Sequence, residues 1–421
     1  MPTELPTGSD ARHPQLPEPL RSAVIAHEDG LLEAAYPLYR EFVAGNPKNA
    51  TALQLFGLLL SQLGQYDYAI VMMRESLKLF PDQAEVANNL GNALLQQGRV
   101  DEAVASYKDA IRIYPEYVDA LRNLGLCYLR TGKPDEAVKP IERCIKLRPT
   151  DAAAWLVLGN IRRQQDDMDA AVTSFRKALE LQPDYAEAHH NLGVCLRLQH
   201  HPEEALEHYE KARDLGMDRA ELYHNIGNAK IDTQEAGPAI DAYRQALSRN
   251  PGDIETHKNL NSLLWQQDLL EDHLESYREV LEKEPSAHQL RMAYATALNQ
   301  KESYVEAEQV LREGVQLAAE SSEMKSLLAF TLEGCGRWDE ALETHAEATN
   351  MTDATPNQLI SYGRALLACG KPEEALRQVR AGAALTPFNQ RALAYLGLCW
   401  SMLGDERDAM LNDYDNMIKS Y

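Results

Sequence analysis

Histidines are the residues in this sequence with the most evident capacity for chemistry. His189, His190, His224 and His257 recur in consecutive segments of the chain, and imidazole is a common metal ligand. A metal site requires its ligands to converge on one ion. Equivalent positions on neighbouring packed helices lie roughly 10 Å apart. We therefore predict no metal ligands and no cofactor among these residues.

Motifs for catalysis are also lacking in the sequence. The tripeptide His27-Glu28-Asp29 has the His-x-Asp spacing of an iron-binding motif, but it lies in a helical pattern without a strand around it. We interpret it as a coincidence. The sequence contains no glycine-rich phosphate loop after a strand and no Gly-x-Ser-x-Gly motif. We predict that this chain is not an enzyme and has no catalytic residues.

The composition is that of an ordered protein with few basic surfaces. Of the 421 residues, 44% are hydrophobic and 25% are charged. The net charge of −22 argues against nucleic-acid and anionic-membrane partners, which are bound by clustered Lys and Arg. No apolar run is long enough to span a membrane.

The N-terminus and the cysteines indicate the compartment. Residues 1–15 carry prolines and acids, without the basic and apolar regions of a signal peptide, so we predict a disordered lead-in. The six cysteines form no Cys-x-x-Cys pair and fall inside helical patterns, so we expect buried, reduced thiols. Together these features predict a cytoplasmic protein.

A 34-residue repeat runs through the sequence from residue 16 onward. Segments 88–117 and 122–151 align at this offset without a gap, and alanine recurs at position 20 of the repeat. Proline closes most repeats at position 32. Position 8 is occupied by Gly57, Gly91, Gly125, Gly159, Gly193, Gly227, Asn261, Ala295, Ala329, Gly363 and Gly397.

Each repeat has the pattern of two helices that cross closely. Small residues at positions 8 and 20 allow the close approach, and apolar neighbours such as Leu90 and Tyr107 form the packed stripe. Proline stops the second helix. Glycine in the turn between the helices tolerates a left-handed C-cap. These turn residues are Gly64, Gly98, Gly132, Gly336, Gly370 and Gly404.

This pattern resembles the tetratricopeptide repeat (TPR) family, whose period is 34 residues. The resemblance implies an all-α, right-handed TPR superhelix, an α-solenoid of about twelve helical hairpins, with the first helices lining a concave groove. It divides the chain into the lead-in at 1–15, the superhelix at 16–403 and a capping or junction helix at 404–421. It also implies a scaffold that binds a protein or peptide partner.

The repeats in the second half of the chain deviate most from the pattern. Asn261 replaces Gly at position 8, and His273 replaces Ala at position 20. Ala319 and Asp353 stand where the closing proline is expected. Two interpretations remain open, namely loose packing or a bend near residues 260–355, and an irregular segment with a function of its own.

Asparagine recurs at positions 6 and 9 of the first helices, which face the groove in the TPR family. Asparagine is a poor helix former, but its side chain offers one acceptor and two donors, enough to hold the backbone of an extended peptide. The row resembles the asparagine ladder of O-linked N-acetylglucosamine transferases, with Val157 interrupting it. The alternative is that these residues stabilise the repeats through hydrogen bonds between helices. The candidate peptide-binding residues are Asn89, Asn92, Asn123, Asn160, Asn191, Asn225, Asn228 and Asn259.

The charges at groove positions constrain the ligand. The carboxylate clamp of some cochaperones is absent, because Ser262 and Ala293 follow Lys258 where asparagine is required. Position 2 is mostly acidic. We therefore predict a neutral or basic peptide segment as the ligand, with self-association into a homo-oligomer as another possibility.

The pattern is lost near the C-terminus, where Asp413 and Asn416 replace an expected aromatic and a small residue. A polar cap on the last hairpin would account for the acids. Alternatively, residues 394–421 resemble the junction between TPR arrays and a C-terminal 2-oxoglutarate/iron(II) oxygenase domain. That resemblance implies a substrate-recruiting module whose iron ligands lie beyond Tyr421.

Overall fold

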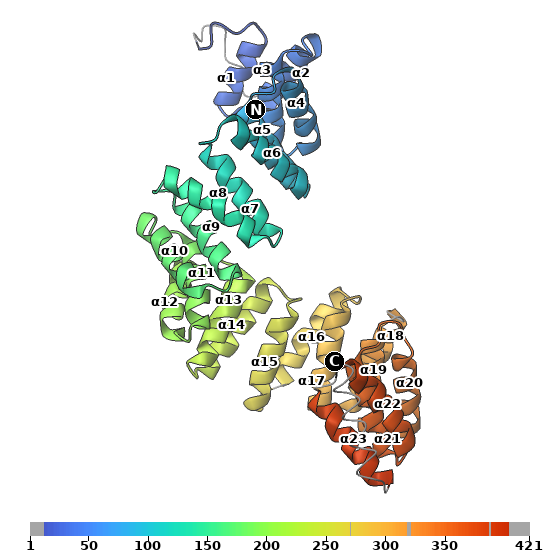
Figure 1. Ribbon diagram of the computed structural model, residues 1–421. Helices are drawn as coiled ribbons and strands as arrows, with labels where there is room; N and C mark the ends of the chain where they lie inside the picture. Colours follow the sequence, from blue (N-terminus) through green and yellow to red (C-terminus); the bar gives the residue numbers. More distant parts are fainter. Residues whose placement is uncertain (1–11, 270, 318–320, 387–388, 404–421) are drawn as a thin grey trace. The chain divides into compact units, whose positions relative to one another are not determined.

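The computed structural model describes residues 12–269, 271–317, 321–386 and 389–403, and contains 23 helices and no strand in these ranges (Figure 1). The predicted all-α array of helical hairpins is confirmed. The first helices of the hairpins are α1 (Leu20–Glu28), α3 (Ala50–Gln62), α5 (Ala84–Gln96), α7 (Val118–Arg130), α9 (Ala152–Gln164), α11 (Ala186–Leu198), α13 (Ala220–Asp232), α15 (Ile254–Gln266), α17 (His288–Gln300), α19 (Ser322–Gly334), α21 (Pro356–Ala368) and α23 (Gln390–Leu403). The second helices are α2 (Leu32–Gly45), α4 (Tyr66–Leu79), α6 (Val100–Ile113), α8 (Pro134–Leu147), α10 (Met168–Leu181), α12 (Pro202–Asp214), α14 (Ala236–Arg249), α16 (Glu271–Lys283), α18 (Tyr304–Leu317), α20 (Trp338–Thr349) and α22 (Pro372–Leu385).

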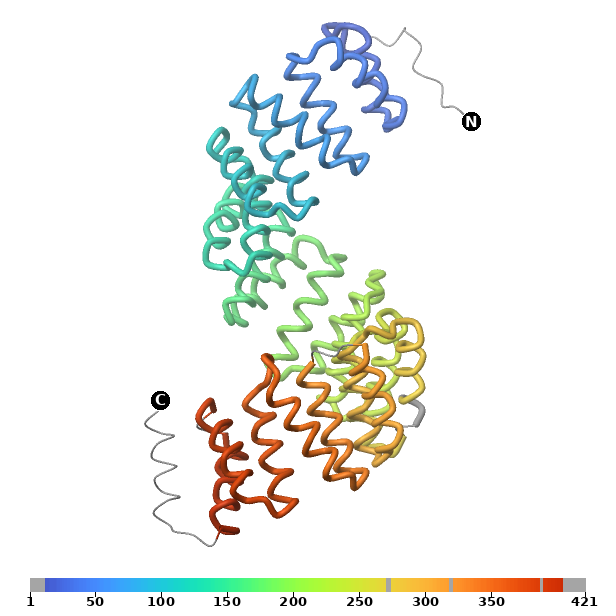
Figure 2. The backbone as a smooth tube through the Cα atoms, turned by 90° about the vertical axis from the view of Figure 1, so that its right-hand side faces the viewer, coloured from blue at the N-terminus to red at the C-terminus, as the bar shows by residue number. Residues whose placement is uncertain are grey.

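The hairpins form two compact units, one ending at Asp218 and the other beginning at Arg219. Within each unit, successive hairpins stack on one another (Figure 2). The predicted lead-in falls partly, and the predicted cap or junction at 404–421 wholly, outside the described residues. In the described part of the chain, no helix combines the length and the apolarity needed to span a bilayer.

The core of each hairpin is a contact between position 8 of the first helix and position 24 of the second. The side chains at position 24 are almost fully buried, and they include most of the largest buried residues of the protein. A Cβ atom added to Gly91 would lie 2.6 Å from the Tyr107 ring, and one added to Gly159 would lie 2.4 Å from the Phe175 ring. The small residue at position 8 therefore makes room for a large one at position 24.

The turn between the two helices has a left-handed residue at position 15 in every hairpin from the first to the eleventh. Glycine occupies this position in six of them, with φ between 69° and 75°. Five of these are predicted turn glycines and the sixth is Gly30, whereas the predicted Gly404 lies outside the described residues. The other five hairpins hold a non-glycine residue in the same conformation. These residues are Asp166, His200, Gln234, Asp268 and Glu302, with φ between 57° and 65°.

We expect Gln234→Gly to raise the free energy of unfolding by about 0.5–1 kcal/mol, because glycine removes the strain of a left-handed L-residue. Gln234 is exposed and at φ 61°, so little packing is lost. Urea unfolding followed by circular dichroism would measure the change, with Gln234→Val as a variant that should be destabilised. A decrease in stability for the glycine variant would contradict this account of the turn.

The eighth hairpin is packed differently from the others. Asn261 replaces the small residue at position 8 and is only 6% exposed. Helix α15 contacts both its partner α16 and α17, the first helix of the next hairpin. Loose packing and an irregular segment with a function of its own both stay predictions for this part of the sequence.

Candidate functional site

A groove of about 1310 Å³ runs along the first helices of the second unit, from α15 to α23. Most of its lining comes from positions 2, 5, 6 and 9 of the first helices. Position 2 contributes Gln289, Glu323, Asn357 and Arg391; position 5 contributes Lys258, Met292, Ser326 and Ile360; position 6 contributes Ala293, Leu327, Ser361 and Tyr395; and position 9 contributes Ser262, Thr296, Phe330 and Arg364.

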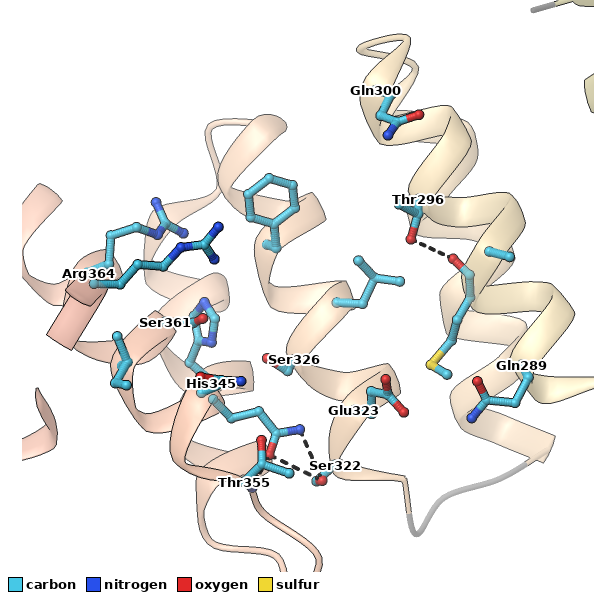
Figure 3. Close-up of a pocket in the computed structure, with 18 of the residues that line it drawn as sticks. Gln289, Thr296, Gln300, Ser322, Glu323, Ser326, His345, Thr355, Ser361 and Arg364 are labelled. Atoms are coloured by element: carbon cyan, nitrogen blue, oxygen red, sulfur yellow. Dashed lines mark hydrogen bonds between the residues drawn. The ribbon is translucent and has the colours of Figure 1, made fainter. Parts of the chain in front are cut away.

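The middle of the groove is apolar and is flanked by hydroxyl groups. Phe330 on α19 is 46% exposed, although it is a large aromatic side chain, and Leu327 lies one turn before it. Thr296 on α17, Ser326 on α19 and Ser361 on α21 surround this centre (Figure 3). An apolar surface with polar neighbours is typical of a site that takes one apolar side chain of a ligand.

A buried charged cluster fixes Arg364 at the side of this centre. Glu333, at the end of α19, accepts a hydrogen bond of 2.9 Å from Nε2 of His345 and bonds of 2.8 and 2.5 Å from Arg364. The Arg364 guanidinium lies 5.8 Å from the centre of the Phe330 ring. Burial raises the pKa of Glu333, but the hydrogen bonds from His345 and Arg364 outweigh it and hold the pKa below its ordinary value. The cluster therefore places a fixed cation beside the exposed aromatic ring.

The connection between α20 and α21, where Asp353 replaces the closing proline, forms the base of the groove. The backbone N–H of Ser322 donates to Asp353 at 3.1 Å and thereby lowers the pKa of that carboxyl. Gln358 donates to the Ser322 hydroxyl at 3.1 Å and accepts from the backbone N–H of Thr355 at 2.6 Å (Figure 3). These bonds join the irregular connection to both neighbouring helices.

The eight predicted asparagines lie outside this groove, and six of them pair across neighbouring repeats. The side-chain amide of Asn123 donates to Asn92 at 3.0 Å, that of Asn191 to Asn160 at 3.1 Å, and that of Asn259 to Asn228 at 3.1 Å. In each pair, position 6 of one repeat donates to position 9 of the repeat before it. Of the remaining two, Asn89 accepts a weak bond of 3.4 Å from Asn88, and Asn225 is half-buried on α13.

Two of these pairs also bind a tyrosine hydroxyl of the core. Tyr107 donates to Asn92 at 2.7 Å, and Tyr243 donates to Asn228 at 2.8 Å. The asparagines thus make the hydrogen bonds between helices that the sequence left open as their alternative role. The pair bond of Asn191 or Asn259 uses one N–H of a side-chain amide that has two N–H groups and one acceptor oxygen.

The sequence did not predict the residues of this groove, because the predicted site residues were the asparagines and the groove is lined by other residue types. Positions 6 and 9 hold Leu327 and Phe330 in α19, and Ser361 and Arg364 in α21. The same position rule, applied to these repeats, identifies the groove residues. Glu333, which holds Arg364 in place, had no comparable signal, because its partners His345 and Arg364 come from two other helices.

The histidines that recur in the sequence contact other protein groups. His189 contacts His208, with their Nδ1 atoms 2.9 Å apart, and Nε2 of His257 lies 2.8 Å from the carbonyl of Pro251. In the His-x-Asp tripeptide, His27 bonds Gln62 and Asp29 pairs with Arg12. No group of three metal-ligating side chains converges anywhere in the described residues.

The cysteines are thiols in two environments. Cys127, Cys144, Cys195 and Cys399 are buried as predicted, whereas Cys335 and Cys369 are half-buried. Burial raises the pKa of the Cys127 thiol to about 11, which keeps it protonated at neutral pH.

Two family models match the sequence. The model described as the cilia and flagella-associated protein 70 C-terminal domain matches residues 48–294, more than half of the chain. A tetratricopeptide repeat model matches residues 357–381. No curated protein sequence matches the chain at a significant level.

Several solved structures are similar in fold. A crystal structure of MamA is 25% identical with a TM-score of 0.36, covering 41% of this chain and 94% of that chain. YrrB, described as a TPR protein with an unusual peptide-binding site, is 25% identical with a TM-score of 0.38, covering 44% of this chain and 96% of that chain. A tetratricopeptide repeat protein from Parabacteroides merdae is 16% identical with a TM-score of 0.48, covering 58% and 97%.

The family follows from the sequence match and the helical hairpins together. The match over residues 48–294 falls on hairpins with the 34-residue period, and the single-repeat match falls on α21 and α22. The chain belongs to the tetratricopeptide repeat family of the cilia and flagella-associated protein 70 C-terminal domain.

Proposed function

We propose that this chain is a non-catalytic scaffold that binds an extended segment of a partner protein in the groove between α15 and α23. The observation that supports this function best is the exposed Phe330 at the centre of the groove. An aromatic side chain in a concave, partly desolvated surface gains binding energy when a ligand covers it.

The charges along the groove favour a neutral segment within the neutral-to-basic range predicted from the sequence. Lys258, Arg364 and Arg391 lie along it with the acids Glu323 and Asp353. Arg364 is paired with Glu333, and Asp353 accepts from Ser322. A segment with an apolar side chain for the Phe330 and Leu327 surface and polar neighbours for the hydroxyl groups fits this lining.

We expect Phe330→Ser to weaken peptide binding at least ten-fold, because the central apolar contact is removed. The probe is a peptide selected from a random decapeptide library on the purified chain, and fluorescence anisotropy measures its affinity. Val305→Ser is the matched control, since Val305 is 79% exposed on α18 and does not line the groove. Equal affinities for the two variants would exclude the Phe330 surface as the binding site.

The asparagine-lined surface is a second proposed contact for the same kind of ligand. We expect Asn191→Ala, Asn225→Ala and Asn259→Ala together to weaken peptide capture while helicity is retained. The variant also loses the 3.1 Å bonds of Asn191 and Asn259, each worth about 1 kcal/mol. Anisotropy and thermal unfolding should be measured together: a stability loss with unchanged affinity would make the asparagines purely structural.

Two alternatives predicted from the sequence concern larger assemblies. Self-association would appear as a mass that rises with concentration in light scattering, whereas a scaffold that acts alone would keep its monomer mass. A recruiting module of an oxygenase would require a reading frame that continues past Tyr421 into a His-x-Asp motif and a distal histidine. Both remain proposals.

A further inference from the structure

We propose that the crevice at Asn261, at the α15 end of the groove, is a subsite for a primary carboxamide, the side chain of an Asn or Gln residue in the bound segment. This inference rests on the proposed peptide-binding function. It adds to that function the identity of one ligand side chain and the residues that select it.

The subsite exists because Asn261 stands where other repeats have glycine or alanine. The side chain is only 6% exposed, yet it lines the groove. Its Nδ2 donates to Oε1 of Gln300 at 3.1 Å, whereas its Oδ1 is buried and accepts no hydrogen bond within the described part of the chain. A buried acceptor left without a donor costs about 1–3 kcal/mol. A ligand N–H group would remove this cost.

The hydrogen bond between Asn261 and Gln300 also determines which group of Gln300 lies beside the Oδ1 acceptor of Asn261. Gln300 uses its Oε1 to accept from Asn261, so its Nε2 group offers donors at the same place. Gln300 is exposed on α17 and lines the groove (Figure 3). The pair therefore presents one acceptor and one donor. A primary carboxamide carries the complementary N–H and C=O groups.

The surrounding charges disfavour ionised ligand groups. Lys258 is the charged residue of α15 that lines this end of the groove, and it would repel a ligand ammonium or guanidinium group. A carboxylate would meet the Asn261 acceptor without a proton to donate. Burial lowers the pKa of His257, so this neighbouring ring is neutral at pH 7. A neutral amide group is not repelled by Lys258, has an N–H to donate to Asn261 and needs no charge on His257.

The floor of the crevice is a fixed aromatic stack. The Tyr277 ring of α16 lines the groove and is fully buried, with the His257 ring 4.4 Å and the Tyr294 ring 5.3 Å from it, centre to centre. The groove reaches this second-helix residue at the hairpin that carries Asn261 at position 8. Because the Tyr277 ring is fully buried, it supports the crevice from below and does not contact the ligand.

The test is an immobilised decapeptide library in which one residue is fixed at each position in turn, probed with the purified chain. We expect Asn or Gln to be enriched at one position and apolar residues at another. Asn261→Gly, which restores the residue type of other repeats, should lose the Asn/Gln preference at least five-fold and keep the apolar preference. Gln300→Glu, which replaces the donor by an acceptor, should shift the preference from carboxamides to Lys and Arg.

The outcomes separate the two proposals. Binding with an apolar preference but without Asn or Gln enrichment, or with an enrichment that Asn261→Gly leaves unchanged, would overturn the subsite and leave the groove intact. An apolar preference that Phe330→Ser removes while the carboxamide preference persists supports both. No binding to any peptide would overturn the groove function and the subsite with it. Circular dichroism of each variant confirms that the helices are retained.

Discussion

Gly159→Ala is expected to lower the free energy of unfolding of its hairpin by about 2 kcal/mol, which is the middle of the range for overpacking a core. The added Cβ would lie 2.4 Å from one carbon of the Phe175 ring and 2.6 Å from the next. The ring is fully buried, so it has no free space into which to move. Hydrogen exchange over residues 152–181 would locate the loss.

Two variants control for the backbone and for the partner. Gly45→Ala adds a Cβ with no atom within 4 Å at the end of α2, so it should be neutral or slightly stabilising. Adding Phe175→Leu to Gly159→Ala should recover part of the loss, because Ala295 and Leu311 form this same pair in the ninth repeat. A double variant as unstable as the sum of its single variants would show that the contact is not the cause.

Glu333→Gln is expected to lower the free energy of unfolding of the second unit by about 2–3 kcal/mol. The substitution removes the charge that pairs with Arg364 and bonds His345, and breaking a buried pair is costly. Arg364 is 31% exposed, which reduces the expected loss because water can solvate it in the variant. Hydrogen exchange over residues 321–368 would report the change.

The matched control is Glu347→Gln, which breaks the ion pair of Lys325 and Glu347 at 2.7 Å, where the glutamate is 62% exposed. Exposed pairs contribute about 0–1 kcal/mol, so this variant should remain close to the wild type. Equal effects of the two substitutions would show that the Glu333 cluster gains nothing from its burial.

The pH dependence gives a second readout for Glu333. Its pKa is lower in the folded chain than in the unfolded chain, so protonation favours unfolding. The stabilisation is complete above the unfolded pKa of about 4.3 and is lost as the pH falls through the folded value. The difference in stability between the wild type and Glu333→Gln should therefore be constant from about pH 6 to 8 and shrink below about pH 4.

The hairpins could be predicted from the sequence because nearly every repeat places small and apolar residues at the same positions of its two helices. From the second to the eleventh repeat, the first helix begins at position 1, from Ala50 to Pro356. Glycine predicted the left-handed turn at Gly98, but Gln234 adopts the same turn without that signal. Packing of the two helices imposes the turn there, and no local residue preference reveals it.

The site was less predictable, because it depends on relations between repeats. The sequence identified the row of asparagines, but their pairing depends on how far one repeat is displaced from the next. Phe330 occupies a predicted groove position, yet the position alone does not reveal that the ring is 46% exposed beside Arg364 of the next repeat. The cluster of Glu333, His345 and Arg364 joins residues from three helices and has no counterpart along the chain.

The asparagine pairs have a consequence for how this array can be lengthened or shortened. Asn123, Asn191 and Asn259 are 68 residues apart, so a pair forms at every second junction between repeats. Removing residues 152–185 would keep every helix intact but place Asn191 beside Leu126, which offers no acceptor. Removing two repeats, residues 118–185, would instead place it beside Asn92. From the third to the eighth repeat, the unit that can be deleted or duplicated while this pairing is kept is therefore two repeats, although the sequence period is one.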